Sequence, residues 1–165
     1  MISKTLILYK GDKLASAFYM GAGVFLGIVA LLLLIFRPSA GYIFLGYGFS
    51  VFSIYMAGKS CFMYYVAHQR LSYFHKQTEW STDLAKEEIR YTKFRILKKK
   101  SGRRIHIYLM FIGAVCAVGG IYSSEKGLIM GTSIPIVLLS GIEFSVGLLT
   151  EFRLKEYLRI LQKPK

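Results

Sequence analysis

The chain of 165 residues (18.7 kDa) combines a formal net charge of +13 with a mean hydropathy of +0.44. Hydrophobic residues make up 54% of it and charged residues 19%, below the roughly 25% that is typical of soluble domains. A disordered basic tail would be poor in apolar residues, so that class is disfavoured. A secreted disulfide scaffold, a coiled coil and an ordinary cytosolic enzyme are disfavoured as well. The composition favours a small integral membrane protein whose charge is gathered on one side.

Four stretches are long and apolar enough to cross a membrane, which takes about 20 mostly apolar residues. They cover about 15–36, 41–67, 105–122 and 128–150, and the only Asp, Glu, Lys or Arg residues in them are Lys59 and Glu143. The first stretch also resembles a signal peptide, but its apolar run exceeds the roughly 7–15 residues of a signal sequence. We therefore predict a retained span. Four buried helices of a soluble bundle are the alternative, but such helices need a polar face that these stretches lack.

The orientation follows from the distribution of Lys and Arg, which gather on the cytoplasmic side of membrane proteins. The N-terminal arm, the segment from Lys59 to Arg104 and the C-terminal tail hold 20 of the 22 basic residues. We predict an all-α integral membrane protein with both termini and residues 68–104 in the cytoplasm. Its parts are an N-terminal arm (1–14), spans one and two (15–67), a basic, mostly helical segment (68–104), spans three and four (105–150) and a basic tail (151–165).

Helical periodicity continues beyond the second span. Ala67, Leu71, Phe74 and Thr78 form an apolar stripe at helical spacing, so this span is expected to extend into the cytoplasm as one helix. The chain would then reverse at residues 79–81. The tail from about 151 to 162 has the same character and is expected to continue the fourth span.

A second cytoplasmic helix is predicted to start at Ser81 or Thr82, either of which can cap it. Its acidic residues come early, three lysines come late at 98–100, and Gly102 follows, which is the charge order that the helix dipole favours. The alternative is a short strand at Tyr91–Leu97, paired with Thr5–Tyr9.

The basic segment has two interpretations. Its cations can simply fix the topology and contact anionic lipid headgroups. Alternatively, they form an anion site, because basic residues attract phosphates and aromatic rings stack on bases. A homo-oligomer, with a tetramer favoured, would repeat each position around one axis. The anion-binding candidates are Arg70, Lys93, Arg95, Lys98, Lys99, Lys100, Arg103 and Arg104, and the stacking candidates are Tyr73, Phe74, Trp80 and Tyr91.

The intramembrane charges also leave two possibilities open. Lys59 and Glu143 lie at similar depths from the cytoplasmic ends of their spans, so they can pair with each other. Ser133, Ser140 and Glu143 also share one helical face, and such a polar stripe lines water or packs closely on another helix. Around a symmetry axis, Glu143 would then form a ring that favours cations.

Small residues mark faces for close helix packing. Gly23 and Gly27 form a GxxxG pattern in the first span, which serves association within one subunit or between subunits. No nucleophile motif or metal-type spacing is present in the sequence, so we expect neither an enzyme nor a cofactor.

With four spans, inside termini and a basic belt running from Arg70 to Arg104 and through the tail, the chain resembles small membrane channel effectors of bacterial anti-phage defence, of the Hailong type. The resemblance is one of architecture and carries over no residue roles. It implies a homotetrameric channel whose ligand is an oligodeoxyadenylate, with the pore closed while single-stranded DNA is bound.

Three functions are consistent with the sequence. The first is a homo-oligomeric ion channel controlled by an anionic cytoplasmic ligand, a nucleotide or a single-stranded oligonucleotide, with a role in antiviral defence. The second is a membrane scaffold or complex subunit whose basic belt binds lipid or a partner. The third is a small ion-coupled exporter that uses Glu143.

Overall fold

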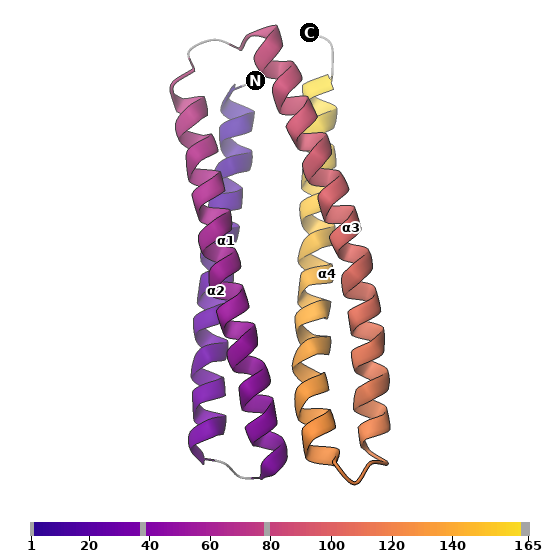
Figure 1. Cartoon of the computed structure of the whole chain (residues 1–165). Coiled ribbons are helices and arrows are strands. Elements are labelled where there is room, and N and C mark those ends of the chain that lie inside the picture. Colours follow the sequence, from indigo (N-terminus) through magenta and orange to yellow (C-terminus); the bar gives the residue numbers. More distant parts are fainter. Residues whose placement is uncertain (1, 37–38, 78–79, 163–165) are drawn as a thin grey trace.

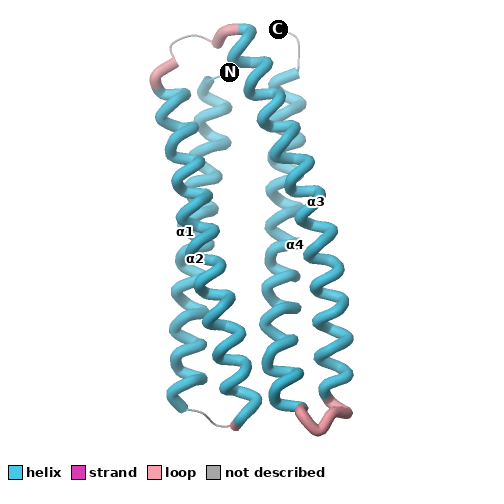
Figure 2. Tube along the Cα trace, viewed as in Figure 1, coloured by secondary structure: helices cyan, strands magenta, loops and turns pink. Residues whose placement is uncertain are grey.

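The computed structural model describes residues 2–36, 39–77 and 80–162. These form four helices, α1 (Ile2–Phe36), α2 (Ala40–His75), α3 (Thr82–Gly120) and α4 (Lys126–Gln162), joined by short connections (Figure 2). Each helix is long and apolar enough to cross a membrane. At about 1.5 Å per residue each is over 50 Å long, whereas the hydrocarbon core of a bilayer is about 30 Å thick. Every helix is therefore longer than this apolar layer is thick.

The helices form two hairpins that stand side by side. α1 packs along α2, α3 packs along α4, and contacts between α2 and α4 join the hairpins (Figure 1). Both chain ends and the α2–α3 connection lie at one end of the bundle, and the other two connections lie at the opposite end. We call the first of these the charged end, and it comprises residues 2–14, 68–77, 80–104 and 151–162.

Helix continues past the second and fourth apolar stretches as predicted, since α2 runs to His75 and α4 to Gln162. The capping prediction is also confirmed, because the Ser81 hydroxyl accepts a hydrogen bond from the Leu84 amide at 3.2 Å. Thr78 and Glu79, expected in the α2 stripe and in the reversal, lie outside the described residues.

The structure has the expected helix and not the alternative strand after residue 81, but it places the end of that helix elsewhere than expected. Tyr91–Leu97 and Thr5–Tyr9 are helical, so the strand pairing does not form. The second cytoplasmic helix also does not end near Gly102, because α3 continues through that residue into the third span. One glycine costs a helix about 1 kcal/mol, whereas a break beside an apolar span would leave several backbone groups without hydrogen bonds.

The N-terminal arm belongs to α1, which the sequence did not indicate. Its buried face carries Thr5 and Asp12 beside Leu8 and Tyr9, while Ile7 and Leu14 are exposed. The buried face is thus mixed, unlike that of a soluble amphipathic helix, whose apolar side faces the core.

The charged end holds two of the three clusters of buried side chains among the described residues. One lies around Leu8, Leu154 and Tyr157 and the other around Tyr9 and Phe74. All four helices contribute to these clusters. A third cluster, formed by Tyr19, Phe52 and Met56, receives no side chain from α3. It lies in the membrane half, by which we mean the part of the bundle that holds the four apolar stretches. In the apolar 18-residue stretch of α3 only 6% of the residues are buried in the bundle, against 28% in that of α4.

Glycines set the close approach of the helices. A Cβ atom on Gly23 would lie 3.2 Å from the Cβ atom of Met56, so this part of the GxxxG pattern packs on α2 within the chain. A Cβ atom on Gly131 would lie 2.6 Å from the carbonyl oxygen of Gly41 and 3.0 Å from the amide of Leu45. Backbone atoms cannot move aside as a flexible side chain can, so α2 and α4 meet here only because Gly131 lacks a side chain.

Gly131→Ala is therefore expected to lower the free energy of unfolding by about 1–3 kcal/mol, the usual cost of overpacking. Gly147→Ala is the matched control on the same helix, because no atom lies within 4 Å of the position of its added Cβ. Thermal unfolding of both variants in detergent measures the difference. Equal stability of the two variants would contradict a close contact between α2 and α4.

Candidate functional site at the charged end

A pocket between α2 and α3 brings together three of the residues predicted to bind an anion or to stack. It has a volume of about 510 Å³, and Arg70, Tyr73 and Tyr91 line it together with Val66, Gln69 and Glu87. The pocket exists because α2 continues past its span and α3 begins before its own, so that the two extensions face each other. A guanidinium group, two phenol rings and an amide can hold an anion and a planar group together.

Arg70 is the central cation of this pocket. Its guanidinium carbon lies 4.0 Å from the centre of the Tyr91 ring, the distance of a cation–π contact. One of its nitrogens lies 3.3 Å from Glu87 Oε1 at the surface and 3.9 Å from Glu88 Oε2 in the interior. Arg70 is therefore shared between an exposed and a buried carboxylate.

Glu88 joins all four helices. It belongs to α3 and is 1% exposed, and its Oε1 accepts hydrogen bonds from the Tyr9 hydroxyl of α1 at 2.7 Å and the Tyr157 hydroxyl of α4 at 3.3 Å. Arg70 of α2 supplies the nearest cation, and Oε2 has no hydrogen-bond donor among the described residues. We call Glu88, Tyr9, Tyr157 and Arg70 the four-helix node.

Burial raises the pKa of the Glu88 carboxyl, and the hydrogen bonds and the charges of Arg70 and Arg95 counteract this only in part. Burial, followed by the charge of Glu88, likewise raises the pKa of the Tyr9 hydroxyl. Glu88 lies in the charged half of α3, far from its apolar half. Burial thus disfavours the charged form of the Glu88 side chain, and the nearby charge of Arg70 reduces this penalty.

The raised pKa of Glu88 means that the folded protein binds this proton more tightly than the unfolded chain does. Its contribution to stability is fully present below the unfolded pKa and is lost as the pH rises through the folded pKa. We expect the melting temperature of the wild type to contain a component that falls with rising pH, and Glu88→Gln should remove it. Glu87→Gln, which changes the exposed neighbour, is the control and should retain the component in melting curves measured between about pH 4 and 8.

Three of the predicted anion-binding cations are held in ion pairs within the chain. Arg95 contacts Asp12 at 2.7 Å and Arg103 contacts Glu151 at 2.7 Å, both across helices, and Arg70 is paired as described. These contacts fix α3 against α1 and α4.

The other predicted cations, Lys93, Lys98, Lys99, Lys100 and Arg104, form no salt bridge with any described residue. Lys99 is half-buried, and the remaining four are exposed. Lys93, Lys100 and Arg104 lie at i, i+7 and i+11 and thus on one face of α3. Arg90, which is not among the predicted cations, lies near this face one turn earlier. We call Arg90, Lys93, Lys100 and Arg104 the basic stripe.

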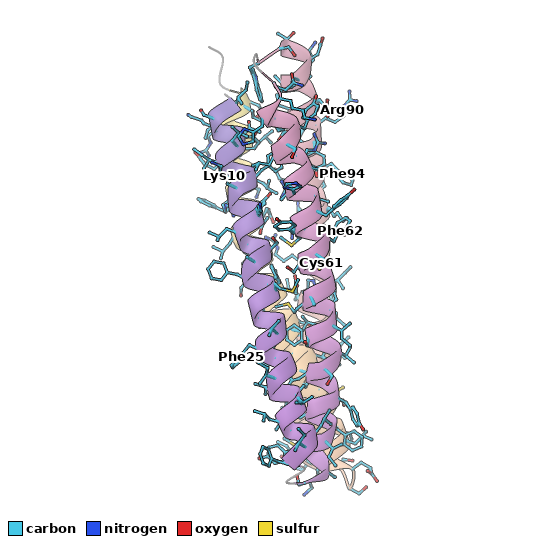
Figure 3. All side chains as sticks on the ribbon, turned by 90° about the vertical axis from the view of Figure 1, so that its left-hand side faces the viewer. Lys10, Phe25, Cys61, Phe62, Arg90 and Phe94 are labelled. Carbon is cyan, nitrogen blue, oxygen red and sulfur yellow. The ribbon has the colours of Figure 1, made fainter. Side chains whose placement is uncertain are left out.

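The aromatic candidates divide in a similar way. Phe74 is 1% exposed and stacks on Tyr9, and Trp80 packs against Phe74 with ring centres 6.2 Å apart. Tyr73 and Tyr91 line the pocket instead. Two further exposed rings lie nearby, since Phe94 of α3 and Phe62 of α2 point to the same side of the bundle as Arg90 (Figure 3).

Lys59 and Glu143 form a salt bridge that joins α2 to α4 within the membrane half. Glu143 is 5% exposed, and its Oε1 has no hydrogen-bond partner among the described residues. The Lys59 ammonium also lies 4.7 Å from the ring centre of Tyr19 and 5.7 Å from that of Tyr55. The pairing alternative from the sequence is therefore present in the structure.

Ser133 and Ser140 are buried on the same face of α4 as Glu143. Among the described residues, no group of three or more His, Cys, Asp and Glu side chains is arranged to hold a metal ion. Comparison of the chain with protein-family models, with curated proteins and with solved structures gives no match.

Proposed function

We propose that the chain assembles into a homo-oligomeric membrane channel controlled by an anionic ligand at its charged end. The observation that carries this proposal is the continuity of α3. One half of this helix presents the exposed basic stripe, and the other half is the least covered of the four candidate spans. A ligand bound to one half can therefore move the other half directly.

Self-association is supported by the thin shape of the bundle. Four helices in two hairpins enclose too little space for an ion path, and α3 exposes large apolar side chains along its membrane half, including Tyr108, Phe111 and Ile112. Copies of the chain placed around one axis would cover this face and gather the basic stripes. A tetramer is the favoured assembly, and the remaining apolar surface would contact lipid.

The distribution of charge supports a cytoplasmic position for both termini and residues 68–104. The ligand would then be a nucleotide or a single-stranded oligonucleotide, whose phosphates fit the stripe and whose bases fit the tyrosine rings of the pocket. On the architectural resemblance alone, we place the channel in a bacterial inner membrane as an effector of anti-phage defence.

One observation favours an ion-coupled exporter as a second candidate. The Lys59–Glu143 pair places a buried carboxylate within an apolar span, where such groups mark ion pathways, and one of its oxygens is unpaired among the described residues. This candidate gives no role to the basic stripe.

The proposal is tested on protein purified in mild detergent. We expect a particle mass of several copies, with absorbance at 260 nm that falls after nuclease treatment. A variant with the basic stripe changed to glutamine should keep the mass and lose the absorbance. A wild-type monomer without a bound anion would contradict both the assembly and the ligand.

A further inference from the structure

The pocket and the four-helix node share one residue, and this suggests how they communicate. We propose that Arg70 couples them, so that an anion bound in the α2–α3 pocket competes with Glu88 for Arg70 and loosens the node. The inference rests on the proposed function for its ligand, and it adds the residue through which binding reaches the helix packing.

The position of Arg70 allows this exchange. Its side chain is 24% exposed and lines the pocket, so an anion can approach it from solvent. Its contact with Glu87 is at the surface, where an ion pair contributes little. Its contact with Glu88 is 3.9 Å long and is not a hydrogen bond. An anion that accepts two hydrogen bonds from the guanidinium would therefore compete with both carboxylates successfully.

Glu88 cannot lose Arg70 without consequence. Its side chain is 1% exposed, and Oε2 accepts no hydrogen bond from the described residues. Tyr9 and Tyr157 both donate hydrogen bonds to Oε1. Arg95 also attracts the Glu88 carboxylate, but it is already ion-paired with Asp12. A buried carboxylate whose nearest cation turns away is strongly disfavoured. The closed node then opens, so that water can solvate the carboxylate.

Opening of the node would release α3. α3 packs extensively on α4 alone, while α1 packs on α2. The ionic and hydrogen-bond contacts of Glu88 with Tyr9 and Arg70, and of Arg95 with Asp12, hold α3 to the first hairpin at the charged end. They act together with the packing of Leu84 against Tyr9 and Phe74. Because α3 continues into its span without a break, a shift at Glu88 is carried into the membrane half.

The test measures the distance between α1 and α3 at the charged end. Spin labels are placed at Lys4→Cys and Lys86→Cys, both exposed, after Cys61 and Cys116 are changed to serine. Labelled chains are diluted with unlabelled ones so that only distances within one chain are read. The probes are inorganic tripolyphosphate and a short single-stranded oligodeoxyadenylate. If both probes change the distance, phosphate groups are recognised. If only the oligodeoxyadenylate changes it, the nucleotide unit is recognised.

We expect either probe that binds to lengthen the wild-type distance. Arg70→Gln should show the longer distance without any probe, and adding Glu88→Gln to it should restore the short one. Glu88→Gln alone keeps an acceptor for Tyr9 and Tyr157 without needing a cation. It should bind the probe about tenfold more tightly and keep the short distance. Lys126→Gln, which changes an exposed cation at the opposite end of the bundle, is the control and should respond like the wild type.

The proposal is overturned if Arg70→Gln keeps the short distance, or if Glu88→Gln opens on binding as the wild type does. If neither probe binds the wild type, control by an anion fails instead, and the ligand-free distances in Arg70→Gln and in the double variant still decide whether Arg70 holds the node closed. If Arg70→Gln does not fold, the response of Glu88→Gln to the probe decides whether the coupling exists.

Discussion

Lys59→Met is expected to lower the free energy of unfolding by about 3–5 kcal/mol, because it leaves Glu143 charged and buried without its partner. Glu143 is 5% exposed, whereas the Lys59 side chain is 18% exposed. The lysine stem is also long enough to carry its ammonium toward water. Glu143→Met should therefore lower the free energy of unfolding by less than Lys59→Met does, although it removes the same ion pair.

The double variant Lys59→Met/Glu143→Met should recover most of this loss, since a buried ion pair can often be replaced by apolar side chains of similar volume. Denaturant unfolding of the three variants in detergent measures the cycle. Glu125→Gln, which changes an exposed carboxylate near the start of α4, is the control and should match the wild type. If the losses of stability in the two single variants add up to the loss in the double variant, Lys59 and Glu143 do not interact directly.

Neutralising Lys93, Lys100 and Arg104 is expected to weaken binding of a single-stranded oligonucleotide about a hundredfold at about 0.1 M salt. Each phosphate contact to a single strand contributes about 0.7 to the slope of log K against log salt, so the slope should fall by about 2 for each subunit that contacts the strand. Titrations at several salt concentrations with the glutamine variant measure both quantities.

A variant with Lys4, Lys10 and Lys126 changed to glutamine loses the same charge from exposed positions outside α3. It should bind nearly as the wild type does. Equal losses in the two variants would mean that net charge alone attracts the strand and that the basic stripe is not a site.

The four helices, and the continuation of helix past the second and fourth apolar stretches, could be predicted because those signals are local. Apolar runs of sufficient length mark the four helices, and Ser81 precedes a helix that it caps. The pairing of Lys59 with Glu143 could also be anticipated, because helical rise converts sequence position into depth once the ends of two spans are known.

The helical N-terminal arm and the four-helix node could not be predicted in this way. Hydrophobic periodicity assumes that the apolar side of a helix faces the core, whereas the buried faces of α1 and α4 carry Thr5, Asp12, Ser140 and Glu151. The node also joins residues far apart in the chain, since Thr5 bonds Tyr157 and Tyr9 bonds Glu88. No local pattern specifies such pairs.

The basic segment shows why charge in a sequence does not by itself define a binding site. Arg95 and Arg103 have the same residue type and neighbourhood in the sequence as Arg104, yet the first two are held by Asp12 and Glu151. Helical phase separates them, because Arg104 continues the face of Lys93 and Lys100 while Arg95 and Arg103 point toward other helices. Once α3 is known to be continuous, the helical repeat indicates which residues of the whole basic segment share a face.

Ion flux into liposomes tests the central claim most directly. Wild-type protein should conduct ions when free of its anionic ligand, and adding a single-stranded oligodeoxyadenylate to the side of the charged end should change the flux. The variant with the basic stripe neutralised should conduct without responding. If wild-type liposomes are as tight as empty ones in both conditions, or conduct equally with and without the oligonucleotide, the chain is not a channel under the control of this anion.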